Sequence, residues 1–104
     1  MRLNPYHPER FWSHLGRAFY AARRYAEAVD AFKRIVRPDP GQLAFLAASH
    51  AQAGDPAAAR SLADEVVRRE PQFSGERYLA TLHYKHDSDR AHHREGVLKA
   101  GLPG

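Results

Sequence analysis

The sequence predicts an all-α protein made of about six helices that pack as stacked hairpins. The first observation is internal similarity, because shifting the chain against itself by 31 residues aligns residues of the same kind. The second is that apolar residues recur at helical spacing, and the third is that each repeat ends in proline. The aligned pairs are Trp12/Leu43, Leu15/Leu46, Gly16/Ala47, Ala28/Ala59, Ile35/Val66 and Pro40/Pro71.

The first unit is predicted over residues 9–42 as two amphipathic helices joined by a turn at residues 22–24. Pro8 suits the start of the first helix, where its missing N–H costs nothing. Gly16 lies inside that helix at a cost of about 1 kcal/mol relative to alanine, which indicates a close helix–helix approach. Its apolar stripe is Phe11, Trp12, Leu15, Phe19 and Tyr20, and the second helix carries Tyr25, Ala28, Val29, Phe32, Ile35 and Val36.

The second unit is predicted over residues 43–73. Its first helix, from Gln42 to Ala53, has almost no charged face and must be covered on several sides. Gly54 is expected to cap that helix, and Asp55 with Pro56 to begin the next one.

Residues 74–104 are predicted as a degenerate third pair that caps the C-terminus. We expect one helix from Ser74 to about Lys85, a loop at residues 87–89, and a last helix over residues 90–100. Gly101 would end that helix, with Leu102 folding back onto it. Because the last helix carries few apolar residues, its outer face is expected to be exposed, as in the final helices of repeat arrays.

Three segments of the first unit together resemble the tetratricopeptide repeat: Trp12-x2-Leu15-Gly16-x2-Phe19, Ala28-x3-Phe32 and Pro40. The resemblance implies an α-solenoid with a right-handed superhelix, and a module that binds other proteins. It also implies that residues 1–8, with Leu3-Asn4-Pro5, are the end of a preceding repeat and a linker.

Two further segments, residues 3–10 and 92–103, look similar to the C-terminal repeats of bacterial class III adenylate/guanylate cyclases. This resemblance implies a regulatory or scaffolding role within a larger bacterial protein. It assigns no catalytic residue to the present chain.

Composition limits the remaining function classes. The chain has 104 residues, no cysteine, and 16 basic against 12 acidic residues. The basic excess is mild and dispersed, so nucleic acid is the least favoured partner. No apolar stretch is long enough to cross a membrane or to form a signal peptide, so we expect no membrane insertion and a cytoplasmic domain.

Histidines are the main candidates for chemistry. His83, His86 and one of His92 or His93 have spacing that is compatible with a metal site. Adjacent histidines point about 100° apart on a helix, and no cysteine supports the set, so exposed histidines are the favoured interpretation. No motif for catalysis or for a phosphate site is found, and we predict no catalytic, metal or cofactor-binding residue.

The first helix of each pair lines the concave side of a repeat stack, which predicts a shallow groove with a basic rim. This groove would hold an extended or helical segment of another protein, with acidic and apolar residues. The predicted groove residues are Arg10, Ser13, Arg17, Tyr20, Ala44, Ala48, Ala51, Arg77, Thr81 and Tyr84.

Two alternatives remain open from the sequence. The first is a self-association module, in which the first helix pairs between two chains to form a homodimer. The second is a helical repeat that binds nucleic acid, which would show affinity that falls steeply with salt.

Overall fold

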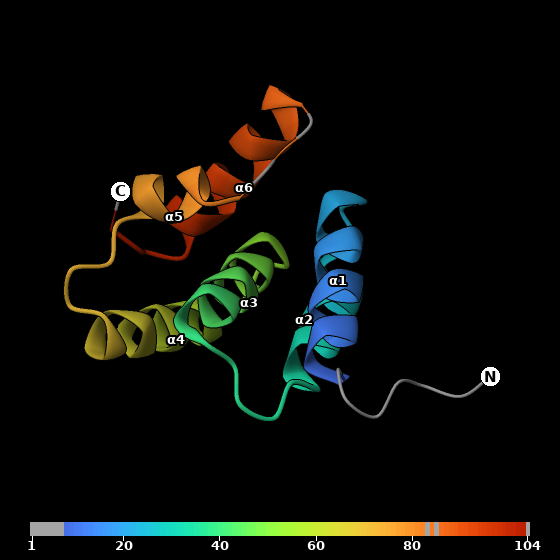
Figure 1. Cartoon of the computed structure of the whole chain (residues 1–104), viewed down its shortest axis with the longest axis horizontal. Coiled ribbons are helices and arrows are strands. Elements are labelled where there is room, and N and C mark those ends of the chain that lie inside the picture. Colours follow the sequence, from blue (N-terminus) through green and yellow to red (C-terminus); the bar gives the residue numbers. More distant parts are fainter. Residues whose placement is uncertain (1–7, 83, 85, 104) are drawn as a thin grey trace.

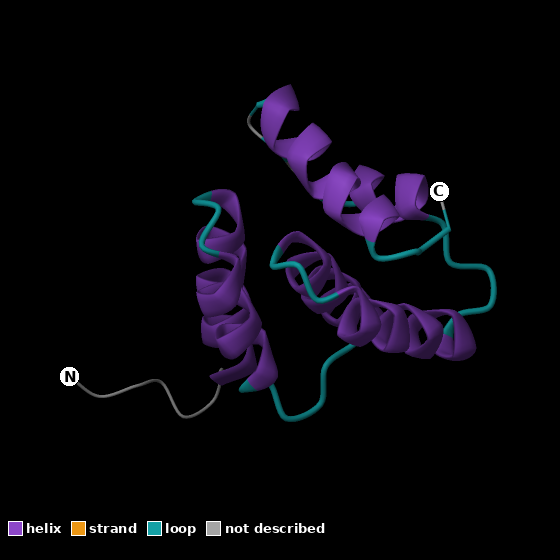
Figure 2. Cartoon of the chain, turned by 180° about the vertical axis from the view of Figure 1, so that it is seen from behind, coloured by secondary structure: helices purple, strands orange, loops and turns teal. Residues whose placement is uncertain are grey.

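The computed structural model describes residues 8–82, 84 and 86–103, and over these residues the chain is all-helical with no strand. The pairs α1–α2 and α3–α4 pack in sequence, with α2 against α3, and α5 packs with α6. Figures 1 and 2 show α3 lying between the α1–α2 pair and the α5–α6 pair. The helices are α1 (Pro8–Ala21), α2 (Tyr25–Lys33), α3 (Pro40–Gln52), α4 (Pro56–Arg69), α5 (Gly75–Ala80) and α6 (Asp87–Lys99).

The predicted fold class is confirmed, and the boundaries of the first four helices lie within a few residues of the expected ones. Asp39 begins α3 with a capping box, because its carboxylate accepts from Gln42 N and the Gln42 side chain accepts from Asp39 N. Gly54 caps the same helix with φ +89°, as expected. The carboxylate of Asp55 accepts from Ala58 N and begins α4.

The close approach predicted at Gly16 is confirmed. A Cβ at this position would lie 2.7 Å from the Phe32 ring, which fills the space between α1 and α2. Phe32 is fully buried and stacks on Phe45 at 5.1 Å between ring centroids, which joins the first pair of helices to α3. The core is therefore continuous from α1 to α4.

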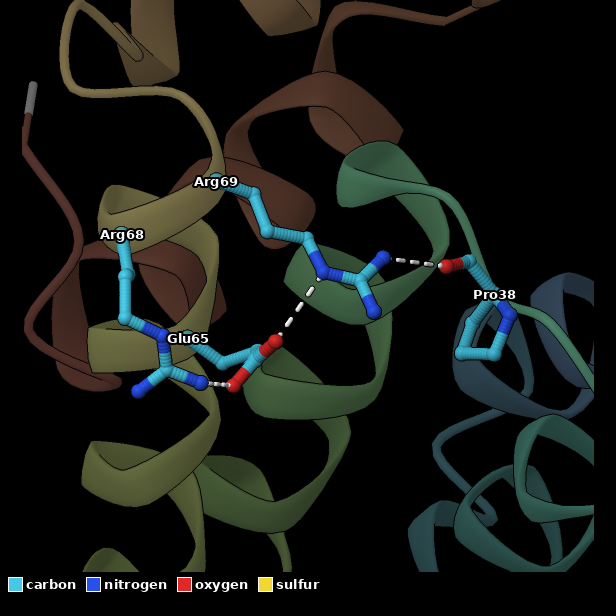
Figure 3. Close-up of polar contacts among 4 residues, drawn as sticks. All are labelled: Pro38, Glu65, Arg68 and Arg69. Carbon is cyan, nitrogen blue, oxygen red and sulfur yellow. Dashed lines mark hydrogen bonds and ion pairs between the residues drawn. The ribbon is translucent and has the colours of Figure 1, made fainter.

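The loop between α2 and α3 is fastened to α4 by Arg69 (Figure 3). Arg69 Nη1 donates to the carbonyl of Pro38 at 3.0 Å, and its Nε donates to Glu65 Oε2 at 3.0 Å. Arg68 bonds the other oxygen of the same carboxylate. Glu65 therefore orients the guanidinium of Arg69, which joins α4 to the loop between α2 and α3.

The third pair departs from its predicted boundaries. The helix expected over residues 74–85 ends at Ala80, because the amides of Thr81 and Leu82 bond three residues back and the Thr81 hydroxyl donates to Tyr78 O. The prediction of a loop at residues 87–89 is wrong. Asp87 and Asp89 instead form the first turn of α6, where the helix dipole favours acidic residues. Leu102 folds back as expected, is buried, and donates its amide to Val97 O.

The third pair also packs differently from the first two. The α5–α6 pair joins the first four helices mainly through α6, which lies on α3. The division into repeat units at residues 9–42 and 43–73 stays a prediction, with α3 beginning inside the first range. The predicted segment 1–8 lies outside the described residues except for Pro8.

Candidate partner-binding site

The predicted groove is only partly open. Four of its ten residues are buried: Tyr20, Ala44, Ala48 and Ala51. The expectation that they are exposed is wrong because α6 packs on α3 and covers this face. Among the other six, Arg10, Arg77 and Thr81 are exposed, while Ser13, Arg17 and Tyr84 are half-buried. Their role in binding stays a prediction.

The contact between α6 and α3 is close because its residues are small. Ala44, Ala48 and Ala51, which we call the alanine face of α3, lie on one side of that helix. A Cβ at Gly96 of α6 would be 3.0 Å from Ala48 Cβ. The two backbones therefore approach more closely than larger side chains would allow.

Tyr20 joins α1 to both of these helices. Its hydroxyl donates to the carbonyl of His92 at 2.8 Å and accepts from Gln52 Nε2 at 3.3 Å. Its ring stacks on the His92 imidazole at 4.5 Å and meets Phe45 edge-on at 5.3 Å. Burial raises the pKa of Tyr20, so the phenol stays protonated and donates.

His93 is fully buried, contrary to the expectation of exposed histidines, because it points from α6 into an aromatic cage. Its ring stacks on Phe45 at 3.9 Å between centroids. Tyr84 Oη bonds His93 Nδ1, and Tyr78 Oη lies 3.3 Å from Nε2. Since Tyr78 donates its proton to Gly41 O at 3.2 Å, the network assigns the histidine proton to Nε2 and makes Nδ1 an acceptor from Tyr84.

Burial lowers the pKa of His93 to about 3, and the positive charge of Arg17 lowers it further in the same direction. The imidazole is therefore neutral at neutral pH. Burial also raises the pKa of Tyr84 to about 12, with Arg17 acting in the opposite direction. The cage is thus a set of neutral hydrogen-bonding groups close to the permanent cation of Arg17.

That cation lies in a cleft of about 330 Å³ between α1 and α6, which we call the α1–α6 cleft. Arg17 lies over the Phe45 ring with its Cζ 5.8 Å from the centroid. Over the described residues, no carboxylate lies within ion-pair distance of Arg17. The cleft is lined by His14, Arg17, Ala18, Tyr20, Ala21, Phe45, Tyr84, Asp89 and His92.

The α1–α6 cleft brings together Arg17, Tyr20 and Tyr84 of the predicted residues. His14 was not among the predicted groove residues, although His14, Arg17, Ala18 and Ala21 follow the i, i+3, i+4, i+7 spacing of one helix face. Phe45, Asp89 and His92 had no comparable signal, because their place depends on where α6 packs.

Arg77 and Thr81 line a different cleft, of about 710 Å³, between the start of α3 and α5. Prolines and aromatic rings make up much of its surface, including Pro40, Phe73 and Tyr78. The predicted groove residues are therefore not continuous: Arg17, Tyr20 and Tyr84 line one cleft, Arg77 and Thr81 line another, and Arg10 and Ser13 line neither.

Neither a metal-binding cluster nor a membrane-spanning helix is found among the described residues. Over residues 8–82, 84 and 86–103, no group of three or more His, Asp or Glu side chains is arranged to hold a metal ion. His83 of the considered set lies outside the described residues. None of the described helices has the length and apolar character needed to cross a membrane.

The described helices pack as hairpins, an all-helical fold that is consistent with a repeat of the tetratricopeptide type. Residues 2–42 match the family model of the tetratricopeptide repeat. Among the described residues, this segment contains α1, α2, the loop to α3 and the first residues of α3. No curated protein and no solved structure matches the chain. The repeat is typical of modules that bind other proteins and carry out no catalysis.

Proposed function

We propose that this chain is a non-catalytic protein-interaction module whose α1–α6 cleft holds an acidic and apolar segment of a partner protein. The observation that carries the proposal is Arg17, a half-buried guanidinium above an aromatic floor with no carboxylate partner among the described residues.

A carboxylate of the partner would complete this site. Arginine pairs with carboxylates through two parallel N–H···O bonds, which are stronger in a sheltered cleft than at an exposed surface. Phe45 and the tyrosine rings supply apolar area for neighbouring leucine or phenylalanine side chains. Arg10 and Ser13 would continue the contact along α1, whereas Arg77 and Thr81 would form a second contact in the separate cleft at α5.

Short fluorescein-labelled peptides test this proposal. One set alternates glutamate with leucine and phenylalanine, and a matched set carries glutamine in place of glutamate. Fluorescence anisotropy should show tighter binding of the glutamate peptides, and Arg17→Gln should weaken that binding about tenfold. Arg60→Gln, which removes the same charge from an exposed position on α4, is the control and should have no effect.

Equal binding of both peptide sets would contradict the proposal, as would equal losses in Arg17→Gln and Arg60→Gln. Either result would mean that the cleft does not select a carboxylate through Arg17.

The wider setting that we propose is a cytoplasmic bacterial protein in which this module regulates or scaffolds a catalytic domain, such as an adenylate cyclase. Support comes from the similarity of residues 3–10 and 92–103 to the repeats of those cyclases. Sequencing the reading frame upstream of this chain is the test. A cyclase domain there would support the setting, and its absence would remove it.

Self-association through α1 is a second candidate, favoured by Phe11. This aromatic side chain is 41% exposed and meets the Trp12 ring edge-on at 4.9 Å, which leaves an aromatic pair near the surface. Sedimentation over a concentration series should then show a dimer that Phe11→Ser abolishes. Val36→Ser, at a residue that is 80% exposed, should leave it intact. A monomer at every concentration excludes this candidate.

A further inference from the structure

We infer that the α1–α6 cleft selects a partner segment that carries a basic residue beside its acidic one, with Asp89 binding the basic side chain and Arg17 the acidic one. This inference deepens the proposed function and rests on it, because it names a second charge that the same partner must supply. It makes Asp89 a residue that determines specificity.

The lining of the α1–α6 cleft carries both signs of charge. Arg17 of α1 supplies its guanidinium, Asp89 of α6 supplies its carboxylate, and both residues are half-buried. Burial lowers the pKa of His92, so that imidazole adds no positive charge at neutral pH. A partner that matches this lining therefore carries one charge of each sign.

Neither charge has a partner of opposite sign within the part of the chain that the structure describes. No basic group lies within ion-pair distance of Asp89 there, just as no carboxylate does so for Arg17. Arg90 follows Asp89 directly, but adjacent side chains on a helix point about 100° apart. Half-buried charges have lost part of their hydration, so each of them gains from an oppositely charged group of a ligand.

The two charges stand on helices that are fastened together at another point. The Tyr20 hydroxyl donates to the carbonyl of His92 at 2.8 Å, and the two rings stack at 4.5 Å. Arg17 lies three residues before Tyr20, and Asp89 lies three residues before His92, so each charge is about one turn from this contact. Arg17 and Asp89 are not within ion-pair distance of each other. The cleft thus presents both charges without letting them neutralise each other.

Tyr84 also lines the cleft and lies near both charges. Burial raises the pKa of its phenol, while Arg17 acts in the opposite direction and Asp89 in the same direction, so both charges reach it. Its hydroxyl donates to His93 Nδ1 in the proton assignment given above, which leaves the oxygen lone pairs able to accept. Tyr84 can therefore accept an N–H of the basic side chain that Asp89 attracts.

Asp89 also favours the start of α6 through the helix dipole, and that role must be separated from binding. Asp87 belongs to the same first turn, but it is exposed and does not line the cleft. Asp87→Asn is therefore the matched control for Asp89→Asn. A role in the helix dipole alone predicts the same change of stability in both variants and no change in which peptide is preferred.

Four fluorescein-labelled peptides on one leucine and phenylalanine framework test the inference. Their two variable positions carry glutamate and lysine, glutamate and glutamine, glutamine and lysine, or two glutamines, in both orders. Fluorescence anisotropy should show that the glutamate–lysine peptide binds the wild type about tenfold more tightly than the glutamate–glutamine peptide. Asp89→Asn should abolish this advantage of lysine and keep the advantage of glutamate. Asp87→Asn should behave as the wild type.

Two results would overturn the inference. One is equal binding of the glutamate–lysine and glutamate–glutamine peptides by the wild type, a comparison that does not depend on how any variant folds. The other is an advantage of lysine that Asp89→Asn leaves intact, or that Asp87→Asn reduces equally, since the overall charge would then be responsible.

The same peptides separate this inference from the proposed function. A preference for glutamate over glutamine without any preference for lysine would remove the inference and keep the proposed function. No preference for glutamate in any of the peptides would remove the proposed function, whatever lysine does.

Discussion

Gly96 of α6 lies against Tyr20 of α1 so closely that a Cβ at position 96 would be 2.2 Å from the Tyr20 hydroxyl oxygen. Real Cβ atoms essentially never reach such a distance, so a side chain larger than hydrogen requires either the Tyr20 ring or α6 to shift. The same Cβ would also be 3.0 Å from Ala48 Cβ. The absence of a side chain at position 96 therefore allows the close packing of α6 on Tyr20 and α3.

Gly96→Ala is expected to destabilise the protein by about 2 kcal/mol, although alanine is the better helix former by about 1 kcal/mol. Gly41→Ala is the control, because a Cβ at that helical glycine has only ordinary contacts at 3.4 Å. Urea denaturation should show a lower free energy of unfolding for Gly96→Ala and an undiminished one for Gly41→Ala. Greater stability of Gly96→Ala would contradict the close contact.

Arg23 occupies the left-handed region with φ +62° at the end of α1. Its amide donates to Tyr20 O and the amide of Arg24 donates to Phe19 O, which is the Schellman arrangement usually completed by glycine. Arg23→Gly should therefore stabilise the protein by about 1 kcal/mol. Arg24→Gly should not, since Arg24 has φ −100° and pairs with Glu27. Thermal unfolding of both variants provides the comparison.

His93 should make stability depend on acid. The pKa of His93 is about 3 in the folded chain and 6.5 in the unfolded chain, so between these values the unfolded state binds more protons. The free energy of unfolding then falls as pH falls, by up to about 1.4 kcal/mol per unit and about 2 kcal/mol from pH 7 to 5.

His93→Gln keeps a donor and an acceptor but does not titrate, so it should remove the part of that dependence due to His93 while lowering stability at pH 7. Burial also lowers the pKa of His50 and of His92, so these two histidines supply a remaining dependence of the same sign. Denaturation at both pH values measures the difference. An unchanged pH dependence in His93→Gln would show that another group is responsible.

Arg69 is expected to stabilise the loop between α2 and α3 through Pro38 (Figure 3). Arg69→Met should cost about 0.5 to 1 kcal/mol and should speed hydrogen exchange in that loop. Arg68→Met is the matched control, because Arg68 also pairs with Glu65 but is not hydrogen-bonded to Pro38. Equal effects of the two substitutions would mean that only the Glu65 contact matters.

The sequence by itself determined the local structure of the first two helical pairs. Gly54 and Asp55 could be assigned as helix caps, because a cap depends on hydrogen bonds to amides a few residues away. Most of the apolar stripes were readable as well, since helical spacing is a property of neighbouring residues. Two of the predicted stripe residues were wrong: Phe11 is 41% exposed, and Val36 is 80% exposed and follows the end of α2. Gly16 even indicated a close approach, although the sequence did not show that the Phe32 ring fills the space.

The tertiary structure alone decided where the last helix packs, and with it which predicted groove residues remain accessible. Ala44, Ala48 and Ala51 have the same local pattern whether a partner or α6 covers them, so the sequence could not distinguish these cases. The same holds for His93, whose neutral buried state depends on rings from α1, α3 and α5. Local periodicity fixes the direction a side chain takes from its helix, whereas long-range packing fixes what it meets there.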